Sequence, residues 1–398
     1  MLISSTKNIK CSVPCLFGTL IAATIIIVFA CNILVRWDMM ILSNSEILFG
    51  SEFQQRNKLL EETCKKYYFE DVKYIRPLIM YHPLNLSYCK VPKVASSYWM
   101  RFFSALGDTT SRINAFDRIR FKVHRMHLAN VSQTSGFNNI KNKLIVTRNP
   151  FTRLFSAYVD KIFLSENWQR YGRLIIKDYR DRASSYSLKC GNDVQFHEFL
   201  QFVTAKRNDN SNRHWNPITV ICNPCGIKYN FIIKLESFAK DRDNFIRQIG
   251  IKRDNILKYN NLSHKDYTIH AIRDLAATSI LHFRNKSPKV CYKERILFSK
   301  LFSAFQIQGY IHREAVFNVE DFSDARISDP ESIISVYIKI YNNNPLTSRK
   351  EWEDQRKMYF VKAYQNITFE ILKKIKKMYY LDFRLFDYNL EPERIDNL

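Results

Sequence analysis

The sequence contains little glycine and proline, with only 9 Gly and 11 Pro among 398 residues. Collagen-like and low-complexity chains need a far larger share of these two residues. No internal repeat is apparent, which argues against a solenoid or a propeller. Because 46% of the residues are hydrophobic and 25% are charged, the composition is that of an ordinary globular protein. The length suits one large domain or two of average size.

The glycine-rich phosphate loop of ATPases and GTPases is also missing. No segment matches Gly-x-x-x-x-Gly-Lys-Ser/Thr. This absence weighs against an ordinary ATPase or GTPase.

Acidic residues are scarce relative to basic ones. The 38 Asp and Glu residues face 61 Lys and Arg residues, which gives a net charge of +23. A field of this sign attracts polyanions, and nucleic acid, an anionic membrane and an acidic glycan all suit it. Many of these cations would lie on a solvated surface in any case.

The sequence has one long uncharged apolar run, residues 13–35. It is long enough to cross a bilayer core of roughly 30 Å, whereas the apolar core of a cleaved signal peptide is shorter. We expect a short cytosolic tail over residues 1–12, a transmembrane signal-anchor over 13–35, a stem over 36–80 and a lumenal domain over 81–398. Such a type II arrangement separates the basic domain from nucleic acid.

Five Asn-x-Ser/Thr sequons beyond this run agree with a lumenal, glycosylated domain, although each is weak evidence alone. They begin at Asn85, Asn130, Asn261, Asn285 and Asn366.

Six of the nine cysteines lie beyond the apolar run, at Cys64, Cys89, Cys190, Cys222, Cys225 and Cys291. An even number in an oxidising compartment indicates disulfides, but six cysteines allow 15 pairings. The Cys222-x-x-Cys225 spacing also occurs in zinc and redox sites. Because no second pair at zinc-ligand spacing follows it, we favour disulfides and predict no metal.

Alternating strand-like and helix-like segments predict an α/β domain with a central parallel sheet. Apolar runs predict strands at Leu86–Val91, Lys141–Thr147 and Phe231–Leu235. Helical spacing follows each of them, at Tyr98–Leu106, Phe151–Phe163 and Asp241–Ile249.

The later part of the chain is less regular. Helical spacing recurs at Asn192–Val203, and Val361–Tyr380 has the pattern of a long amphipathic helix. Residues 318–349 carry many Asp, Ser and Asn residues, and we expect a loop-rich insertion there.

Two segments carry most of the functional information. Val91–Trp99 and Thr147–Tyr158 each follow a predicted strand and open a predicted helix. Each places a cation, Lys93 or Arg148, together with hydroxyl groups at the turn, which is what a phosphate-binding strand–loop–helix requires. Two such loops on one chain predict a ligand with two separated anionic groups.

These segments resemble the 5'-phosphosulfate and 3'-phosphate loops of the Golgi carbohydrate sulfotransferases, and of the chondroitin/dermatan 4-O-sulfotransferase group in particular. The resemblance extends to His214–Glu236, which includes His-Trp-Asn-Pro and Cys-Asn-Pro-Cys, and to Leu381–Tyr388. It runs in patches from about Tyr88 to Tyr388.

This resemblance implies a P-loop-like sulfotransferase fold with a central parallel sheet flanked by helices, preceded by a single transmembrane helix. It implies the donor 3'-phosphoadenosine 5'-phosphosulfate (PAPS) and an anionic glycan acceptor. The implied donor-binding residues are Pro92, Lys93, Val94, Ala95, Ser96, Ser97 and Tyr98 in the first loop, and Arg148, Asn149, Pro150, Phe151, Thr152, Arg153, Leu154, Phe155 and Ser156 in the second.

Lys93 is the expected catalytic cation, because a flexible ammonium can neutralise charge that builds on a departing phosphate. Three histidines are candidates for the base that accepts the acceptor's proton. We favour His124 or His127, since related uronosyl sulfotransferases resemble this arrangement in placing a catalytic histidine between the two loops. His214 is equally well explained as a packed histidine, and Glu236 is an alternative carboxylate.

Both segments depart from the family pattern at some positions. Ser96-Ser97-Tyr98 stands where close members carry Cys-Thr-Asn, Met100 replaces a basic residue, and Asn149 replaces an acid. Ser97 keeps a hydroxyl for the donor. The differences leave open another glycan acceptor, or a lumenal glycan-binding protein that has lost catalysis.

Overall fold

The computed structural model describes residues 52–67, 78–107, 115–118, 124, 131–134, 140–205, 211–251, 256, 260–284, 286, 289–346 and 348–392. The chain divides into two compact units, residues 1–55 and 56–398, and the second holds all the features below. The expected transmembrane segment 13–35 lies outside the described residues. None of the helices in the described ranges is long and apolar enough to cross a membrane.

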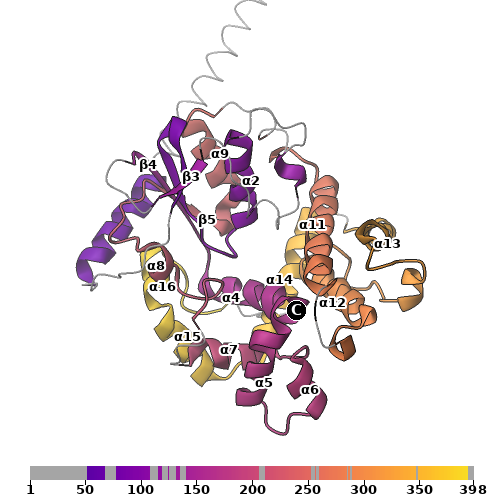
Figure 1. Ribbon diagram of the computed structural model, residues 1–398. Coiled ribbons are helices and arrows are strands. Elements are labelled where there is room, and N and C mark those ends of the chain that lie inside the picture. The colour runs from indigo at the N-terminus through magenta and orange to yellow at the C-terminus, as the bar shows by residue number, and fades with distance from the viewer. Residues whose placement is uncertain are drawn as a thin grey trace, which may run out of the picture. The chain divides into compact units, whose positions relative to one another are not determined.

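A five-stranded sheet with the order β3-β1-β2-β4-β5 forms the centre of the second unit (Figure 1). The strands are β1 (Leu78–Tyr81), β2 (Leu86–Cys89), β3 (Val131–Thr134), β4 (Asn142–Thr147) and β5 (Phe231–Lys234).

The prediction of a wholly parallel sheet is wrong for one side of it. β2, β4 and β5 are parallel, with Tyr88 opposite Leu144 and Ile145 opposite Ile232. β1 pairs antiparallel with both β2 and β3. The reversal follows from the short connection Tyr81–Leu86, since only a crossover of a dozen or more residues can make neighbouring strands parallel.

The strand positions follow from burial. In β4, Leu144, Ile145 and Val146 are all fully buried, as expected for a strand covered on both faces. β2, β4 and β5 confirm the three predicted strands, with ends shifted by one or two residues.

Helices cover the sheet and fill the rest of the unit (Figure 1). They are α2 (Ser96–Gly107), α4 (Pro150–Tyr158), α5 (Arg173–Tyr179), α6 (Ser185–Cys190), α7 (Phe196–Thr204), α8 (Ile218–Cys222), α9 (Phe238–Gln248), α11 (His264–Arg284), α12 (Glu294–Ile307), α13 (Pro330–Asn343), α14 (Arg349–Gln365), α15 (Phe369–Met378) and α16 (Tyr380–Leu385). A π-helical turn, Val159–Phe163, continues α4, and a second lies at Trp168–Gly172.

Three expectations about the helices need correction. The predicted loop-rich insertion at 318–349 contains the 14-residue helix α13. The predicted helix Val361–Tyr380 is two helices, because Thr368 caps a new one, its side chain accepting a hydrogen bond from the Ile371 amide. The helix expected from Asn192 begins only at Phe196.

Two apolar clusters hold these layers together. One surrounds Trp168, Leu301 and Tyr337 and joins α11, α12 and α13. The other surrounds Phe199 and Ile375 and joins α4, α5, α7 and α15. α14 contacts both α4 and α12, so it reaches the side of the sheet where the loops after β2 and β4 lie.

The six cysteines beyond the apolar run form three disulfides, as the sequence favours. The pairs are Cys64–Cys225, Cys89–Cys222 and Cys190–Cys291. Arg56 and Cys64 lie on one helix of the second unit, and Arg56 forms an ion pair with Asp241 at 2.6 Å. These two residues of the expected stem are thus joined to the unit that contains the sheet, and β1 crosses the expected boundary at residue 80.

Candidate functional site

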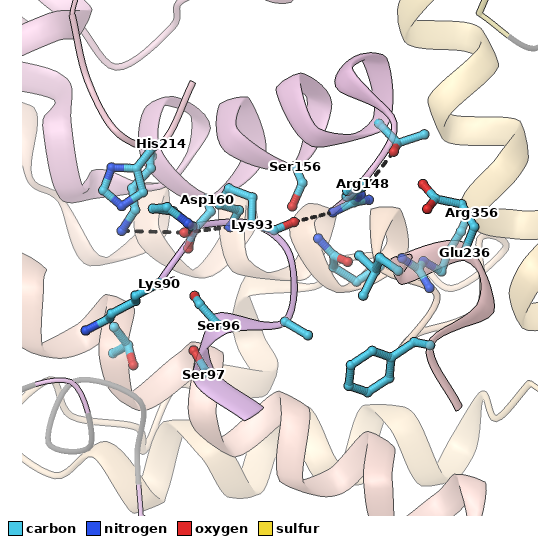
Figure 2. Close-up of a pocket in the computed structure, with 18 of the residues that line it drawn as sticks. Lys90, Lys93, Ser96, Ser97, Arg148, Ser156, Asp160, His214, Glu236 and Arg356 are labelled. Carbon is cyan, nitrogen blue, oxygen red and sulfur yellow. Dashed lines mark hydrogen bonds and ion pairs between the residues drawn. The ribbon is translucent and has the colours of Figure 1, made fainter. Parts of the chain in front are cut away.

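The site lies where β2 and β4 end. These strands are parallel neighbours, so the loops that follow them emerge at the same edge of the sheet. Both loops line one cavity of about 1010 Å³. Figure 2 shows Lys93, Asp160 and His214 toward one end of this cavity, and Arg148, Glu236 and Arg356 toward the other.

The first loop turns sharply without glycine. Lys93 and Ala95 adopt left-handed backbone conformations, with φ angles of 70° and 60°. Non-glycine residues adopt such angles at a cost of roughly 1–3 kcal/mol and are concentrated at functional sites. The turn leads directly into α2, so Ser96 and Ser97 lie at a helix N-terminus, which is a favourable place for an anion.

Five of the seven residues predicted for the first loop line the cavity, namely Pro92, Lys93, Ala95, Ser96 and Ser97. Val94 is fully buried, and Tyr98 packs among aromatic rings while its hydroxyl donates to Asn260 Oδ1 at 2.9 Å. The side chains of these two residues therefore support the loop from behind.

Lys93 is fixed by a carboxylate that the sequence analysis missed. Its Nζ atom lies 2.8 Å from Asp160 Oδ2, and Lys161 Nζ lies 3.5 Å from the same oxygen. Lys161 also forms an ion pair with Glu166. Asp160 follows Ser156 by one helical turn, so the i, i+4 spacing was a signal that could have identified it.

In the second loop, Arg148 joins the two loops. Its Nη1 atom donates to the carbonyl oxygen of Lys93 at 3.1 Å, and Nε donates to Thr152 Oγ1 at 3.0 Å. Burial, with the nearby Arg356 cation, lowers the pKa of Arg148 to about 10, against the opposing effect of Glu236. Because burial and the second cation outweigh the effect of Glu236, an added anion beside Arg148 and Arg356 would be stabilised.

The start of α4 has the proline in the first turn that the sequence predicts. Asn149 caps the helix, its side chain accepting from the Phe151 amide at 2.9 Å, and Pro150 occupies the first turn. Arg148, Thr152 and Ser156 line the cavity. Phe151 and Leu154 are buried in the core, and Phe155 packs against Phe196.

Arg153 does not line the cavity, contrary to its assignment as a donor ligand. It is 1% exposed, and its guanidinium donates to three carbonyl oxygens, those of Pro92 at 3.2 Å, Arg213 at 3.0 Å and Asn216 at 2.6 Å. Arg153 therefore ties the first loop to the turn that carries His214.

The structure brings two of the three candidate histidines to the cavity. His124 Nε2 lies 3.2 Å from Ser97 Oγ. His127 lies outside the described residues. His214 lies at the other wall, beside the pair formed by Lys93 and Asp160 (Figure 2).

The surroundings of His214 set its protonation. Asn212 Oδ1 accepts from the His214 backbone amide at 2.9 Å and lies 2.8 Å from Nδ1, while Asn212 Nδ2 donates to the Tyr171 hydroxyl. Since this oxygen can only accept, Nδ1 carries the proton and Nε2 keeps a lone pair. Burial, followed by the Lys161 cation, lowers the pKa of His214 well below its usual value. The imidazole is thus neutral at pH 7.

Glu236 is committed to the second loop. Its Oε1 accepts from the Asn149 amide at 2.9 Å, and its Oε2 accepts from the Tyr388 hydroxyl at 3.1 Å. Glu236 therefore positions this loop, which weakens its case as the base.

α14 supplies residues that the sequence analysis missed, including Arg349, Trp352 and Arg356. No local signal marks them, because tertiary packing alone brings this helix to the cavity. Among the described ranges, no group of three or more His, Cys, Asp or Glu residues is arranged to hold a metal ion.

Comparisons with known proteins agree with this geometry. A family model described as "Sulfotransferase family" matches residues 76–306. Carbohydrate sulfotransferase 14 of Danio rerio is 31% identical over 41% of this chain and 45% of its own length. Carbohydrate sulfotransferase 8 of Mus musculus is 28% identical over 49% of this chain and 50% of its own length. Carbohydrate sulfotransferase 11 of Rattus norvegicus is 29% identical over 53% of this chain and 64% of its own length. The chain spans about half the length of the curated relatives that it matches, and no solved structure matches it.

Proposed function

Because the chain belongs to the sulfotransferase family, we propose that it transfers a sulfuryl group from PAPS to a hydroxyl of a glycan. One observation carries the proposal: a single cavity has a cationic group at each of two loops, Lys93 in the first and Arg148 in the second, with Arg356 of α14 beside Arg148. A donor with a phosphosulfate at one end and a phosphate at the other matches that arrangement. The names of the relatives, all carbohydrate sulfotransferases, support a carbohydrate acceptor.

The residues fit the donor by their chemistry. Lys93 and the hydroxyls of Ser96 and Ser97 would hold the 5'-phosphosulfate at the N-terminus of α2. Arg148 and Ser156 would hold the 3'-phosphate, with Arg356 adding a second guanidinium that can fork onto two oxygens. When bound, PAPS supplies the sulfuryl group, and its 5'-phosphate is the leaving group.

Lys93 has a second task besides binding. In the protein its ammonium is held at 2.8 Å by Asp160, so it is oriented toward the cavity before any ligand arrives. A cation that is already in place needs little reorganisation to stabilise charge that develops in a transition state. Asp160 is accordingly a positioning residue for Lys93.

His214 is our choice for the base. It is neutral, its Nε2 lone pair is set by Asn212, and it lies beside Lys93. A neutral imidazole can accept the proton of an acceptor hydroxyl directly. His124 remains the alternative; its hydrogen bond to Ser97 also suits a role in shaping the donor loop. His127 stays a prediction.

The acceptor that the sequence resemblance favours is a chondroitin- or dermatan-like glycosaminoglycan, and the net charge of +23 suits such a polyanion. Another glycan acceptor is the first alternative, and a catalytically lapsed glycan-binding protein is the second. The latter rests on the departures at Tyr98, Met100 and Asn149. A Golgi membrane location with a lumenal domain also remains part of the proposal.

Sulfate transfer is the direct test. The full chain, prepared in detergent, is given labelled PAPS and a panel of glycans beside Lys93→Ala and Arg148→Ala. We expect label on a glycosaminoglycan, with at least about a 100-fold loss in Lys93→Ala, the size of effect that removing one electrostatic stabiliser has. Binding of 3',5'-adenosine diphosphate without transfer to any glycan would favour the lapsed protein. Absence of both would refute the donor site.

A further inference from the structure

A second cavity of about 620 Å³ adjoins the first. Three residues line both cavities, namely Glu166, Arg213 and His214. The proposed base therefore faces the donor loops on one side and this second space on the other. A molecule in the second cavity would lie next to the reacting end of the donor site, and not next to its 3'-phosphate end.

The groups around the second cavity have the chemistry of an acidic-sugar site. Two arginines, Arg170 and Arg213, line it, and both are exposed. Among the described residues that line it, the one carboxylate is Glu166, which Lys161 already counters in an ion pair. With His214 neutral, these described lining residues carry more cationic than anionic charge, which favours an anionic occupant.

The other polar groups among the described lining residues are amides and hydroxyls, including those of Asn167, Ser211 and Asn216. Such groups exchange hydrogen bonds with water and sugar hydroxyls alike. Tyr171 adds an aromatic ring, over which the Arg170 guanidinium lies at 4.9 Å from the ring centre. This ring is the one partner that the described residues provide for the Arg170 side chain, which forms no ion pair or side-chain hydrogen bond with them.

The turn between the cavities is rigid. The Asn216 side chain accepts from the Asn212 amide at 3.0 Å and donates to Ser211 Oγ at 3.1 Å. The buried Arg153 guanidinium donates hydrogen bonds to the carbonyl oxygens of Arg213 and Asn216. The Arg213 side chain is therefore presented from a fixed backbone, which is how a specific site is built.

We propose that the second cavity is the acceptor subsite, and that Arg170 and Arg213 bind the acid group of an acidic sugar, a carboxylate or a sulfate ester, while a neighbouring hydroxyl meets His214. This inference rests on the proposed sulfotransferase function and adds where the acceptor lies and which residues select it. Arg213 and His214 are adjacent in the chain, so recognition of the acid and removal of the proton would be coupled in position.

Binding and transfer are measured separately on the full chain in detergent. The variants are Arg170→Gln and Arg213→Gln, and the control is Arg295→Gln, an exposed arginine of α12 outside both cavities. The ligands are oligosaccharides of unsulfated chondroitin, of the same material with its carboxyl groups reduced, and of reduced material that carries sulfate esters. Work at about pH 8 keeps His214 neutral whatever charge residue 213 carries.

We expect each variant to bind the carboxylated oligosaccharide about tenfold more weakly, with affinity for 3',5'-adenosine diphosphate unchanged and the control unaffected. On the reduced, uncharged oligosaccharide the variants should equal the wild type. If the variants bind more weakly than the wild type only to the reduced oligosaccharide that carries sulfate esters, the acid group recognised is a sulfate ester. Equal losses on charged and uncharged ligands, or no loss at all, would overturn the subsite.

This design separates two failures. Wild-type protein that binds the oligosaccharide through these arginines but transfers no sulfate would contradict the proposed enzyme and leave the subsite standing. Wild-type protein that transfers sulfate while both variants match it on every ligand would contradict the subsite and leave the enzyme standing. Wild-type protein that binds no oligosaccharide would refute the subsite outright.

Discussion

At the scale of single residues, the position of one proton governs the proposed chemistry. The two hydrogen bonds that Asn212 Oδ1 accepts keep the proton of His214 on Nδ1, so Nε2 is the basic atom. Burial is the main cause that lowers the pKa of His214; the cations Lys161, Lys93 and Arg213 lower it further, and Asp160 raises it. Because only the neutral imidazole accepts a proton, the lowered pKa extends activity to lower pH.

This gives a pH-dependent prediction. In the wild type, the fall of kcat/KM for the donor on acidification should lie below about pH 6.5, where an ordinary histidine protonates. Lys161→Met removes a cation that lowers the pKa of His214, so the fall should move to higher pH. Lys177→Met, an exposed lysine of α5, is the control. A profile that stays fixed in Lys161→Met would argue against His214 as the base.

A second prediction concerns Arg356, which faces Arg148 from α14. Arg356→Gln should weaken binding of 3',5'-adenosine diphosphate by about tenfold, because a charge-assisted contact is lost. Affinity for the acceptor should not change, since Arg356 does not line the second cavity. Calorimetric titration measures both, with Lys350→Gln on the same helix as the control. Unchanged affinity for the nucleotide would remove Arg356 from the donor site.

At the scale of elements, two of the disulfides are nested. Cys64–Cys225 and Cys89–Cys222 join nearly the same two parts of the chain. If either disulfide is removed, the other therefore still closes a similar loop. Cys190–Cys291 closes a loop of its own with a sequence separation of 101. In the chain-entropy model, a longer loop that nothing else closes contributes more stability.

Replacing Cys190 and Cys291 with serine should therefore destabilise the protein by about 4–5 kcal/mol. Replacing Cys89 and Cys222 should cost about 3.5 kcal/mol, because Cys64–Cys225 limits the freed segment to roughly 30 residues. Thermal unfolding of the two double variants gives the order directly. The reverse order of Tm would show that native packing around the disulfides outweighs loop closure.

Local signals account for the elements that the sequence predicts well. β2, β4 and the starts of α2 and α4 follow from short apolar runs and from Asn149-Pro150, all within a few residues. The missed helix α13 also had a local signal, since Asp329 caps it and Pro330 opens it, but its polar surroundings concealed the pattern. The disulfide pairing and the position of Arg356 had none, because they depend on contacts between distant segments.

At the scale of the whole molecule, the excess of cations acts over distances longer than any contact. A net charge of +23 attracts a polyanion to the surface before it reaches the cavity. This attraction acts on every charge of a long glycan, whereas a nucleotide donor carries only a few. Salt should therefore affect the two substrates unequally.

Raising the salt concentration from about 0.05 M to about 0.5 M shortens the screening length severalfold. We expect KM for polymeric chondroitin to rise by about tenfold or more, and KM for a chondroitin tetrasaccharide and for the donor to change much less. Initial rates of sulfate transfer at a series of salt concentrations provide the measurement. Equal sensitivity of the polymer and the tetrasaccharide would confine electrostatic recognition to the cavities.

The buried guanidinium of Arg153 has a consequence for how such a protein can diversify. It holds the donor loop and the His214 turn through the carbonyl oxygens of Pro92, Arg213 and Asn216. Every amino acid presents a carbonyl oxygen, so the exposed side chain at 213 can be exchanged while this backbone contact with Arg153 is kept. A lineage could thus acquire a new acceptor while the alignment between donor and base is inherited unchanged.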